Sequence, residues 1–268
     1  MSPELERIAQ KAKAEPKIRF TALAHHLTED FLRETWQGMN KKGAAGVDRV
    51  SVSSYAENLD ENISDLVQTL KAHRYRAPQV RRVYIPKAGN PRKLRPLGIP
   101  TVEDRLLQAG VARLLGVIYE ADFLEGSYGF RPGRTAHQAL AEVRRAVLSN
   151  RAQWVVEADI AGYVNHIDHD WLMRMLEIRI GDPWILRLIR KWLKAGILDD
   201  GETIMPTEGT PQGGLCEAAH KGGHSARCWR TSTSTTCWTY GSPFACAEDA
   251  GGRRSSFASL TTTLSSSS

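Results

Sequence analysis

Several features that would point to other kinds of protein are absent from this 268-residue sequence. No stretch approaches the roughly 18 consecutive apolar residues that a membrane-spanning helix needs. The first residues, Met-Ser-Pro-Glu-Leu-Glu, lack the apolar segment of an export signal, so we expect a cytoplasmic protein with no membrane partner. No Cys-x-x-Cys pair occurs, which argues against a zinc ribbon or a redox motif, and no internal repeat is visible.

Aliphatic residues are scarce in the last part of the chain. Between residues 216 and 268 the group Val, Ile, Leu and Met is represented only by Leu260 and Leu264. All four cysteines and several Ser and Thr runs lie in the same segment, at no metal-ligand spacing. Such a composition cannot bury enough apolar surface for a core, so we predict that residues 216–268 are unstructured.

The chain as a whole has the composition of a globular protein with a mild basic excess. Hydrophobic residues make up 41% and charged residues 25% of the sequence. The 36 Lys and Arg exceed the 30 Asp and Glu, which gives a formal net charge of +6. Residues 1–215 are numerous enough to enclose a core. The excess positive charge is compatible with a polyanionic partner and does not identify one.

The hydrophobic pattern of residues 1–215 predicts more helices than strands, with short strands set between the helices. This is an α+β organisation. Helical spacing favours helices over 21–41, 54–73, a long stretch from 101 to about 119, 135–149, 169–178 and 183–197. Strands are expected over 79–86, 93–99 and 154–156, the first two joined by an Ala-Gly-Asn-Pro turn.

The first segment whose side chains could bind a ligand is this predicted hairpin, residues 84–100. It carries four cations on a short, rigid backbone: Lys87, Arg92, Lys93 and Arg95. Phosphate groups need such donors, and Arg binds them through two parallel hydrogen bonds. The alternative is a basic hairpin that is simply solvated.

Two glycine-rich segments follow. Residues 126–134, Gly-Ser-Tyr-Gly-Phe-Arg-Pro-Gly-Arg, alternate aromatic and basic side chains, which suits base stacking and phosphate pairing. Residues 209–214, Gly-Thr-Pro-Gln-Gly-Gly, allow a close approach between backbone and ligand. Taken alone, each is also compatible with an ordinary loop or turn.

The last segment places an acidic residue at the end of an apolar strand. Asp159 follows Val155-Val156-Glu157-Ala158, and a carboxylate there is costly to desolvate unless something compensates its charge. A divalent cation is one compensation. Backbone N–H groups of the following turn are another.

The order of the four segments, a basic hairpin, Y-G-F-R-P-G-R, a strand-terminal Asp and G-T-P-Q-G-G, resembles the fingers and palm of a group II intron-encoded reverse transcriptase. Gly46-Val47-Asp48 and residues 95–100 and 166–169 are also similar to family sequence, so the resemblance covers about residues 20–214. It implies the right-hand polymerase fold, with fingers and an incomplete palm. It also implies RNA-directed DNA polymerase activity and, for a maturase, binding to the parent intron RNA.

The resemblance also implies a division of the chain and a set of partners. Residues 1–75 would be an N-terminal helical extension with the start of the fingers, 76–150 the fingers and 151–215 part of the palm. The implied substrates are an intron RNA template, a DNA or RNA primer and deoxynucleoside triphosphates. Mg²⁺ is the implied cofactor.

Matching positions then take the family's roles. Asp159 would be the first catalytic carboxylate and would hold Mg²⁺, and the backbone at Ile160 would help to line the metal site. Nucleotide contacts would fall on Lys93, Arg95, Tyr163, Val164, Gln212 and Gly213. Template or primer contacts would fall on Lys87, Arg92, Tyr128, Phe130, Arg131 and Arg134. One departure is visible, because Asn165 stands where the family usually has an acidic residue.

The family's second carboxylate motif, a Tyr/Phe-Ala-Asp-Asp turn, has no counterpart between residue 214 and residue 268. We therefore expect this chain to be inactive as a polymerase. The alternatives are a residual intron-RNA-binding module and a non-functional pseudogene product.

The segment after residue 214 suggests a reason for that absence. With suitable codons read one nucleotide earlier, residues 226–239 can encode S-P-L-L-A-N-I-Y-L-H-Y-V-L-D, which is the family sequence expected after P-Q-G-G. Residues 257–262 can likewise yield R-F-A-D-D. The hypothesis is a change of reading frame after the G-T-P-Q-G-G motif.

Overall fold

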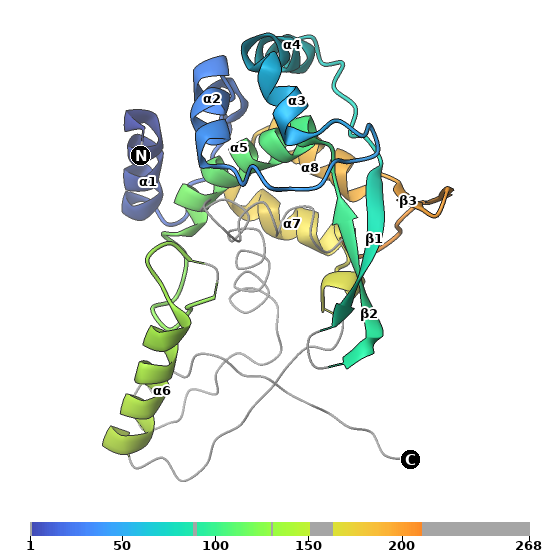
Figure 1. Ribbon diagram of the computed structural model, residues 1–268. Helices are drawn as coiled ribbons and strands as arrows, with labels where there is room; N and C mark the ends of the chain where they lie inside the picture. Colours follow the sequence, from blue (N-terminus) through green and yellow to red (C-terminus); the bar gives the residue numbers. More distant parts are fainter. Residues whose placement is uncertain (1, 88–89, 130, 151–162, 211–268) are drawn as a thin grey trace.

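The computed structural model describes residues 2–87, 90–129, 131–150 and 163–210 (Figure 1). Eight α-helices and four strands lie in this part of the chain, with 3₁₀ turns at Ala24–His26 and Tyr163–His166. The helices are α1 (Pro3–Ala14), α2 (Glu29–Gly38), α3 (Val52–Glu57), α4 (Leu59–Lys71), α5 (Val102–Tyr119), α6 (Ala136–Asn150), α7 (His169–Arg179) and α8 (Pro183–Leu193). The strands are β1 (Val80–Lys87), β2 (Asn90–Ile99), β3 (Ile197–Asp199) and β4 (Glu202–Ile204).

Helix α5 lies at the centre of the helical body and is buried on nearly every side. Helices α1, α2 and α3 contact it directly, and one core of apolar side chains joins α1–α5 with α7 and α8. The helix begins where the sequence predicts, because the Thr101 hydroxyl accepts a hydrogen bond from the Asp104 N–H at 3.2 Å. A helix buried all round fixes the position of every element that packs on it.

The predicted α+β organisation is confirmed, with differences at several helix ends. The predicted helix over 21–41 is a 3₁₀ turn followed by α2, because Thr28 caps α2 through its hydroxyl. The predicted helix over 54–73 is interrupted at Asn58 and forms α3 and α4. Helix α1, which the sequence reasoning missed, begins at an N-cap formed by Ser2 and packs on α5.

The four strands form one sheet in the order β2-β1-β3-β4 (Figure 1). The predicted hairpin is present, with β1 and β2 antiparallel and Ile85 opposite Arg95. Strand β3 pairs with β1 in parallel and then turns back into β4. The sequence reasoning assigned residue 197 to a helix and missed this second hairpin, although its Asp200-Gly201 turn is a recognised hairpin signal.

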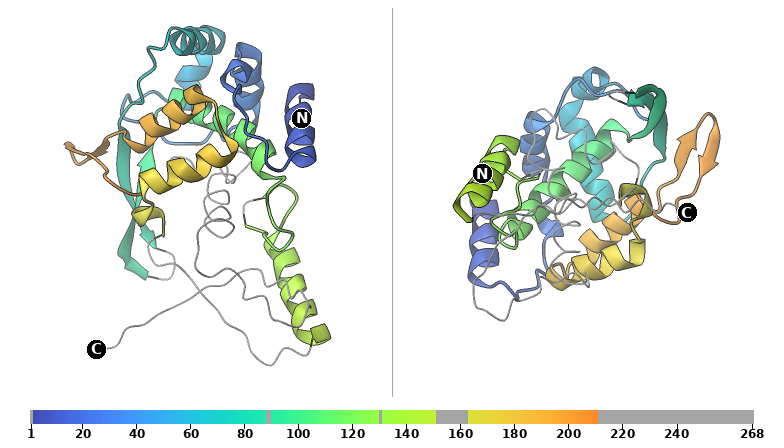
Figure 2. Two further views of the ribbon diagram at one scale, coloured as in Figure 1. Left: turned by 180° about the vertical axis from the view of Figure 1, so that it is seen from behind. Right: turned by 90° about the horizontal axis from the view of Figure 1, so that it is seen from below.

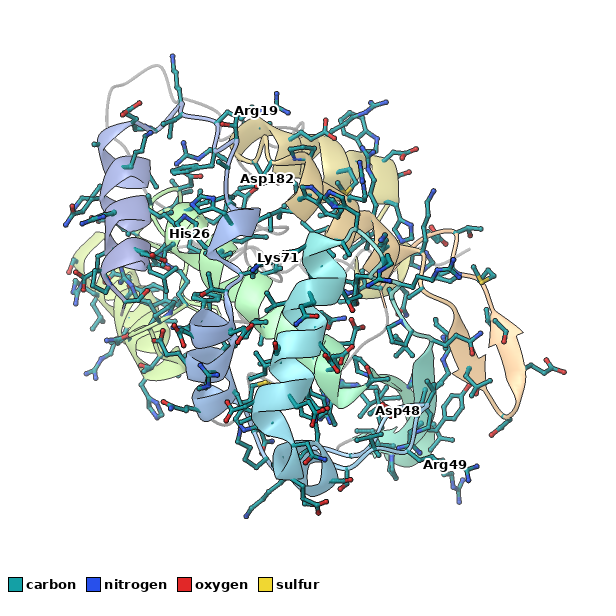
Figure 3. The ribbon with its side chains drawn as sticks, turned by 90° about the horizontal axis from the view of Figure 1, so that it is seen from above. Arg19, His26, Asp48, Arg49, Lys71 and Asp182 are labelled. Carbon is teal, nitrogen blue, oxygen red and sulfur yellow. The ribbon has the colours of Figure 1, made fainter. Side chains whose placement is uncertain are left out.

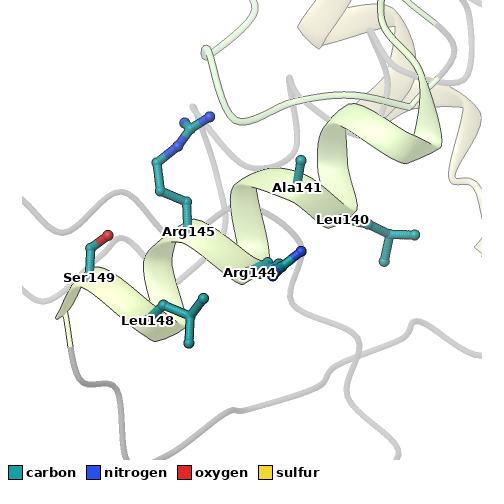
Figure 4. A pocket seen from close by; sticks show the side chains of 6 residues that line it. All are labelled: Leu140, Ala141, Arg144, Arg145, Leu148 and Ser149. Carbon is teal, nitrogen blue, oxygen red and sulfur yellow. The ribbon is translucent and has the colours of Figure 1, made fainter.

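Helix α6 extends away from the helical body (Figures 1 and 2), and part of its apolar side is exposed. Leu140 and Leu148 are each 67% exposed. They line a shallow depression together with Arg144, Arg145 and two small residues (Figure 4). The helix begins with a reciprocal cap, in which Thr135 and Gln138 each accept from the other's backbone N–H.

A buried arginine attaches the N-terminal segment to α7. The Arg179 side chain is 4% exposed, and its guanidinium pairs with Asp122 at 2.9 Å. It also donates to backbone carbonyls between Ala12 and Ile18, including a 2.6 Å bond to Pro16. Because both of its terminal nitrogens donate to carbonyls of residues 12–18, Arg179 fixes the path by which α1 leads into the core.

A buried carboxylate on α5 joins that helix to two other elements. Asp104 on α5 is 1% exposed and accepts hydrogen bonds from the Tyr75 hydroxyl, from Trp192 Nε1 on α8 at 2.9 Å and from Gln108 Nε2 at 3.0 Å. Tyr75 lies in the connection between α4 and β1. Burial raises the pKa of Asp104 to about 6, although the three donors favour its charged form.

This raised pKa predicts a pH dependence of stability. Because the folded state holds the proton more tightly than the unfolded chain, the contribution of Asp104 to stability falls as the pH rises from about 4 to about 6. The loss amounts to about 3 kcal/mol over that window. Asp104→Asn removes the titration and keeps an acceptor for Tyr75 and Trp192. Its amide can donate to Gln108 Oε1, which has no partner among the described residues.

The measurement is urea unfolding of both proteins across that pH range. We expect the stability of the wild type relative to Asp104→Asn to decline with rising pH. Asp104→Leu should lose about 3 kcal/mol or more at every pH, because it leaves buried donors without an acceptor. Parallel pH profiles for wild type and Asp104→Asn would contradict this account.

Candidate nucleic-acid interface

The hairpin presents two of the predicted phosphate-binding cations on one face. Lys93 and Arg95 lie two residues apart on β2, so their side chains leave the same side of the strand, and both are exposed. Arg95 lies opposite Ile85, which is 37% exposed. Arg92, one residue before Lys93, is exposed from the other face. The arrangement leaves cations accessible at the end of the hairpin away from the core.

The root of the hairpin is tied to the turn at residues 43–48. Arg81 on β1 donates two hydrogen bonds to the Ala45 carbonyl, at 2.6 and 3.1 Å. Arg105 on α5 donates to the neighbouring Ala44 carbonyl at 3.0 Å. A side chain at Gly46 would place its Cβ 2.6 Å from the Thr101 backbone, so only glycine fits there. The Gly-Val-Asp segment that contributed to the resemblance thus has a packing role.

The opposite face of the hairpin is braced by the second hairpin. Asp199 on β3 accepts from the Tyr84 hydroxyl at 2.7 Å and pairs with Arg82 at 3.1 Å. The hydrogen bond to Asp199 raises the pKa of Tyr84. Sequence reasoning missed this contact, and no local signal indicates it, because the partners are more than 110 residues apart in sequence. Arg82 is therefore engaged within the protein, unlike the exposed Lys93 and Arg95.

Arg131, predicted to touch nucleic acid, is largely enclosed by its own loop. It is 5% exposed, and its guanidinium pairs with Glu120 at 2.7 Å. It also donates to the carbonyls of Leu124 and Ser127, each at 2.8 Å, and lies over the Phe123 ring. In this structure Arg131 holds the loop in shape.

The same loop presents a second arginine more openly. Arg134 lies over the Tyr128 ring, with 5.2 Å between the guanidinium carbon and the ring centroid, and both residues are half-buried. Arg131 keeps the loop folded while Arg134 and Tyr128 remain partly accessible. Of the residues predicted to contact template or primer from this loop, the stacked pair Arg134 and Tyr128 is therefore the more accessible.

Two segments that are distant in sequence meet at the start of the Gly-Thr-Pro-Gln-Gly-Gly motif. The Thr210 N–H donates to the Val164 carbonyl at 2.9 Å, and the Gly209 N–H donates to the Ile167 carbonyl at 2.8 Å. The His169 ring contacts the Gly209 carbonyl at 2.7 Å. Gly209 has φ of 73°, and an added Cβ would lie 2.4 Å from the Asn165 carbonyl oxygen. Residues 164–169 are thus fixed against the start of the glycine-rich motif.

Several predicted site residues lie outside the part of the chain that the structure describes. These are the metal-binding pair Asp159 and Ile160, and Phe130, Gln212 and Gly213. For Lys87 and Tyr163 the structure describes the backbone within β1 and the 3₁₀ turn. Within the described ranges, no group of three His, Cys, Asp or Glu side chains has a metal-binding arrangement. None of the helices described is long and apolar enough to span a membrane.

Comparison with known proteins agrees with this geometry. Residues 85–216 match the model of the family described as reverse transcriptase (RNA-dependent DNA polymerase). The group II intron-encoded protein LtrA of Lactococcus lactis subsp. cremoris is 38% identical over 215 residues, which cover 79% of this chain and 35% of LtrA. This chain belongs to the reverse transcriptase family. Its resemblance to the group II intron-encoded members is confirmed.

Two further comparisons extend the picture. Protein YkfC of Escherichia coli K12 is 36% identical over 220 residues, covering 79% of this chain and 57% of YkfC. A chain of a solved partial Cas6-RT-Cas1–Cas2 complex aligns with this chain at 22% sequence identity and a TM-score of 0.46. The alignment covers 79% of this chain and 32% of the chain in that complex, and the likeness is too weak to support an argument. This chain thus spans between a third and three fifths of the length of these two curated relatives.

The contact at Gly209 predicts a large effect of a small substitution. Gly209→Ala would combine a left-handed backbone with a clash against the Asn165 carbonyl, and should lower the free energy of unfolding by about 2–4 kcal/mol. Gly133→Ala is the matched control, because Gly133 has φ of 70° and nothing within 4 Å of the added Cβ. It should cost only about 1–2 kcal/mol. Equal losses in urea unfolding would show that the junction with Asn165 is not tightly packed.

Proposed function

We propose that this chain supplies the substrate-binding part of an RNA-directed DNA polymerase of the group II intron type. The observation that carries the proposal is the junction of residues 163–169 with Gly209 and Thr210, which brings two family motifs together. The exposed cations Lys93 and Arg95 support it, because a triphosphate or a nucleic-acid backbone needs such donors.

The proposed substrates are an RNA template, a DNA or RNA primer and deoxynucleoside triphosphates. Lys93 and Arg95 would contact the triphosphate, and Tyr163 and Val164 would lie beneath the nucleotide sugar. Further nucleotide contacts would come from Gln212 and Gly213. Template and primer would be contacted from the hairpin and the adjoining loop, through Lys87, Arg92, Tyr128, Phe130 and Arg134, with Arg131 holding the loop in shape.

Mg²⁺ is the proposed cofactor, held by the Asp159 carboxylate with help from the Ile160 backbone. The support is the sequence Val155-Val156-Glu157-Ala158-Asp159, which predicts a strand that ends at this carboxylate, together with the family membership. Bound Mg²⁺ would supply charge stabilisation for nucleotidyl transfer. The protein's own residues would position the triphosphate and the primer.

We infer that the chain does not polymerise by itself. Nucleotidyl transfer uses two Mg²⁺ ions, which the family holds with carboxylates from two motifs, and the sequence from Gly214 to Ser268 contains no Asp-Asp pair to supply the second. Purified chain with primed RNA template, deoxynucleoside triphosphates and Mg²⁺ should give no cDNA above background. Robust extension that is abolished by Asp159→Asn would overturn this inference and place a complete active site in the chain.

Binding by the hairpin is tested separately from polymerisation. Lys93→Gln with Arg95→Gln removes both donors that we assign to the triphosphate, so it should weaken binding of a labelled deoxynucleoside triphosphate in the presence of a primed template. Lys11→Gln with Lys13→Gln on α1 is the control, since it removes the same charge from another exposed surface. Equal effects of the two variants would reduce the hairpin's role to general electrostatic attraction.

A second candidate function is an RNA-binding module without polymerase activity. It is favoured by the same exposed hairpin cations, which need no metal to bind a phosphate backbone. Salt-sensitive RNA binding together with absent primer extension would support this function for the chain as it stands. Absent binding would favour a non-functional product.

The change of reading frame is tested at the level of DNA. The family match ends at residue 216, two residues after Gly214, where the composition also changes. We expect the coding DNA, read one nucleotide earlier from about codon 226, to encode S-P-L-L-A-N-I-Y-L-H-Y-V-L-D. Any other sequence in that frame would eliminate the hypothesis.

A further inference from the structure

A second basic surface lies on the side formed by α7, α8 and the connection from α4 to β1. Helices α7 and α8 pack against each other and face the viewer when the molecule is seen from behind (Figure 2, left). The residues of this surface come from residues 71–76, 171–178 and 184–194. We call it the back face. The hairpin residues Lys93 and Arg95 are not part of it.

Helix α8 is amphipathic, with an accessible side that is almost wholly cationic. Its buried side consists of apolar residues in contact with the core. After Pro183, its exposed residues are Arg187, Arg190 and the adjoining Lys194, and Lys191 is half-exposed. The acid at its start, Asp182, is 4% exposed and accepts bonds from four backbone N–H groups. Asp182 is therefore committed to capping and does not neutralise the surface.

The connection after α4 runs alongside α8. The His73 ring is stacked on the Trp184 ring, with centroids 3.8 Å apart and an interplanar angle of 7°. Near the other end of the helix, the Lys191 ammonium donates to the Tyr75 carbonyl. Figure 3 labels Lys71 at the end of α4 and Asp182, the residue that caps the start of α8. This path leaves Lys71, Arg74 and Arg76 exposed beside the cations of α8.

The stacked histidine occupies a position that usually favours glycine. His73 has φ of 64° and directly follows the C-cap of α4, where its N–H donates to Leu70 and the next N–H donates to Thr69. A non-glycine residue in this conformation costs about 1 kcal/mol. The histidine therefore places an exposed ring on Trp184 at a backbone position where glycine would be cheaper.

Two tryptophan–arginine pairs complete the surface. Arg174 lies 5.1 Å from the centroid of Trp171 on α7, and Arg187 lies 4.8 Å from that of Trp184 on α8. Trp171 is 57% exposed. Each arginine follows its tryptophan by three residues, so the same aromatic and cationic combination occurs on two adjacent helices.

Negative charge on the back face is limited. Helix α7 contributes two carboxylates, Asp170 and Glu177, and Glu177 pairs with Arg190 at 3.0 Å. Within the described part of the chain, no carboxylate forms an ion pair with the other back-face cations. The core of a protein–protein interface is depleted in charged residues. A surface that binds single-stranded nucleic acid instead needs cations for the phosphate backbone and aromatic rings for the bases.

We propose that the back face binds single-stranded nucleic acid through Trp171, Trp184 and the surrounding cations, independently of the hairpin. The phosphate backbone would follow the cations of α8 and of residues 71–76, and bases would stack on the exposed Trp171 and on the His73–Trp184 pair. The proposal requires neither Mg²⁺ nor polymerisation, so it can be correct or wrong independently of the proposed function.

The test uses the full chain and labelled single-stranded oligonucleotides of one sequence, as RNA and as DNA, across a salt series. The triple variant Arg74→Gln/Arg187→Gln/Lys194→Gln changes exposed side chains only. It should lower the salt slope by about 2, because each lost phosphate contact contributes about 0.7. The control Arg7→Gln/Lys11→Gln/Lys13→Gln removes the same charge from α1 and should bind as the wild type does.

A stacking variant supplies a readout that charge alone would not change. Trp171→Ala should weaken binding about tenfold, and Trp171→Phe should restore part of the loss. Equal losses of affinity for the RNA and the DNA oligonucleotide would support recognition of the phosphate backbone and the bases. A loss of affinity for RNA alone would indicate that the back face also contacts the 2′-hydroxyl groups. Wild-type binding by both the triple variant and Trp171→Ala would overturn the proposal. In that outcome a protein partner would be the better occupant of the back face, and a defect in the hairpin variant would still support the proposed function.

Discussion

The described structure depends on one buried carboxylate. Asp104 lies on the central helix α5 and accepts from Tyr75 in the α4–β1 connection and from Trp192 on α8. A buried charge is tolerated only when such donors surround it, so the three elements are held at fixed distances from one another. The connection that ends at Tyr75 continues into β1, and the same connection borders the back face. One polar cluster therefore positions both surfaces that carry exposed cations.

Accessible and engaged cations are clearly separated in this protein. Arg81, Arg82, Arg131 and Arg179 donate to carbonyls or carboxylates of the chain itself and hold connections in place. Lys93, Arg95 and the cations of α8 project from elements that these arginines or the core have already fixed. A cation on a fixed element loses little further freedom when it binds phosphate, which favours binding. The structural arginines thus preorganise the surfaces that we propose to bind nucleic acid.

Much of the architecture could be predicted from local patterns. Thr101 marks the start of α5, the Leu59-Ile63-Leu66-Leu70 stripe lies on the core side of α4, and the basic hairpin pairs in the expected region. The failures occurred where a local signal competes with packing. Thr28 and Asn58 interrupt regions that the apolar spacing alone would join, and the chain after Leu193 leaves the helix to pair with β1. Strand pairing across more than 100 residues has no local signature.

The order of four motifs in the sequence by itself indicated that this chain belongs to the reverse transcriptases, because motif order can be recognised without knowing any tertiary contact. Composition alone also marked the change after residue 215. Only the tertiary structure decided which cations are accessible. Arg131 and Arg134 have the same side chain in the same loop, yet burial and the Glu120 carboxylate enclose one and leave the other partly open. Likewise, only folding brings His73 onto Trp184 and Thr210 onto Val164, since these contacts join segments that the sequence keeps far apart.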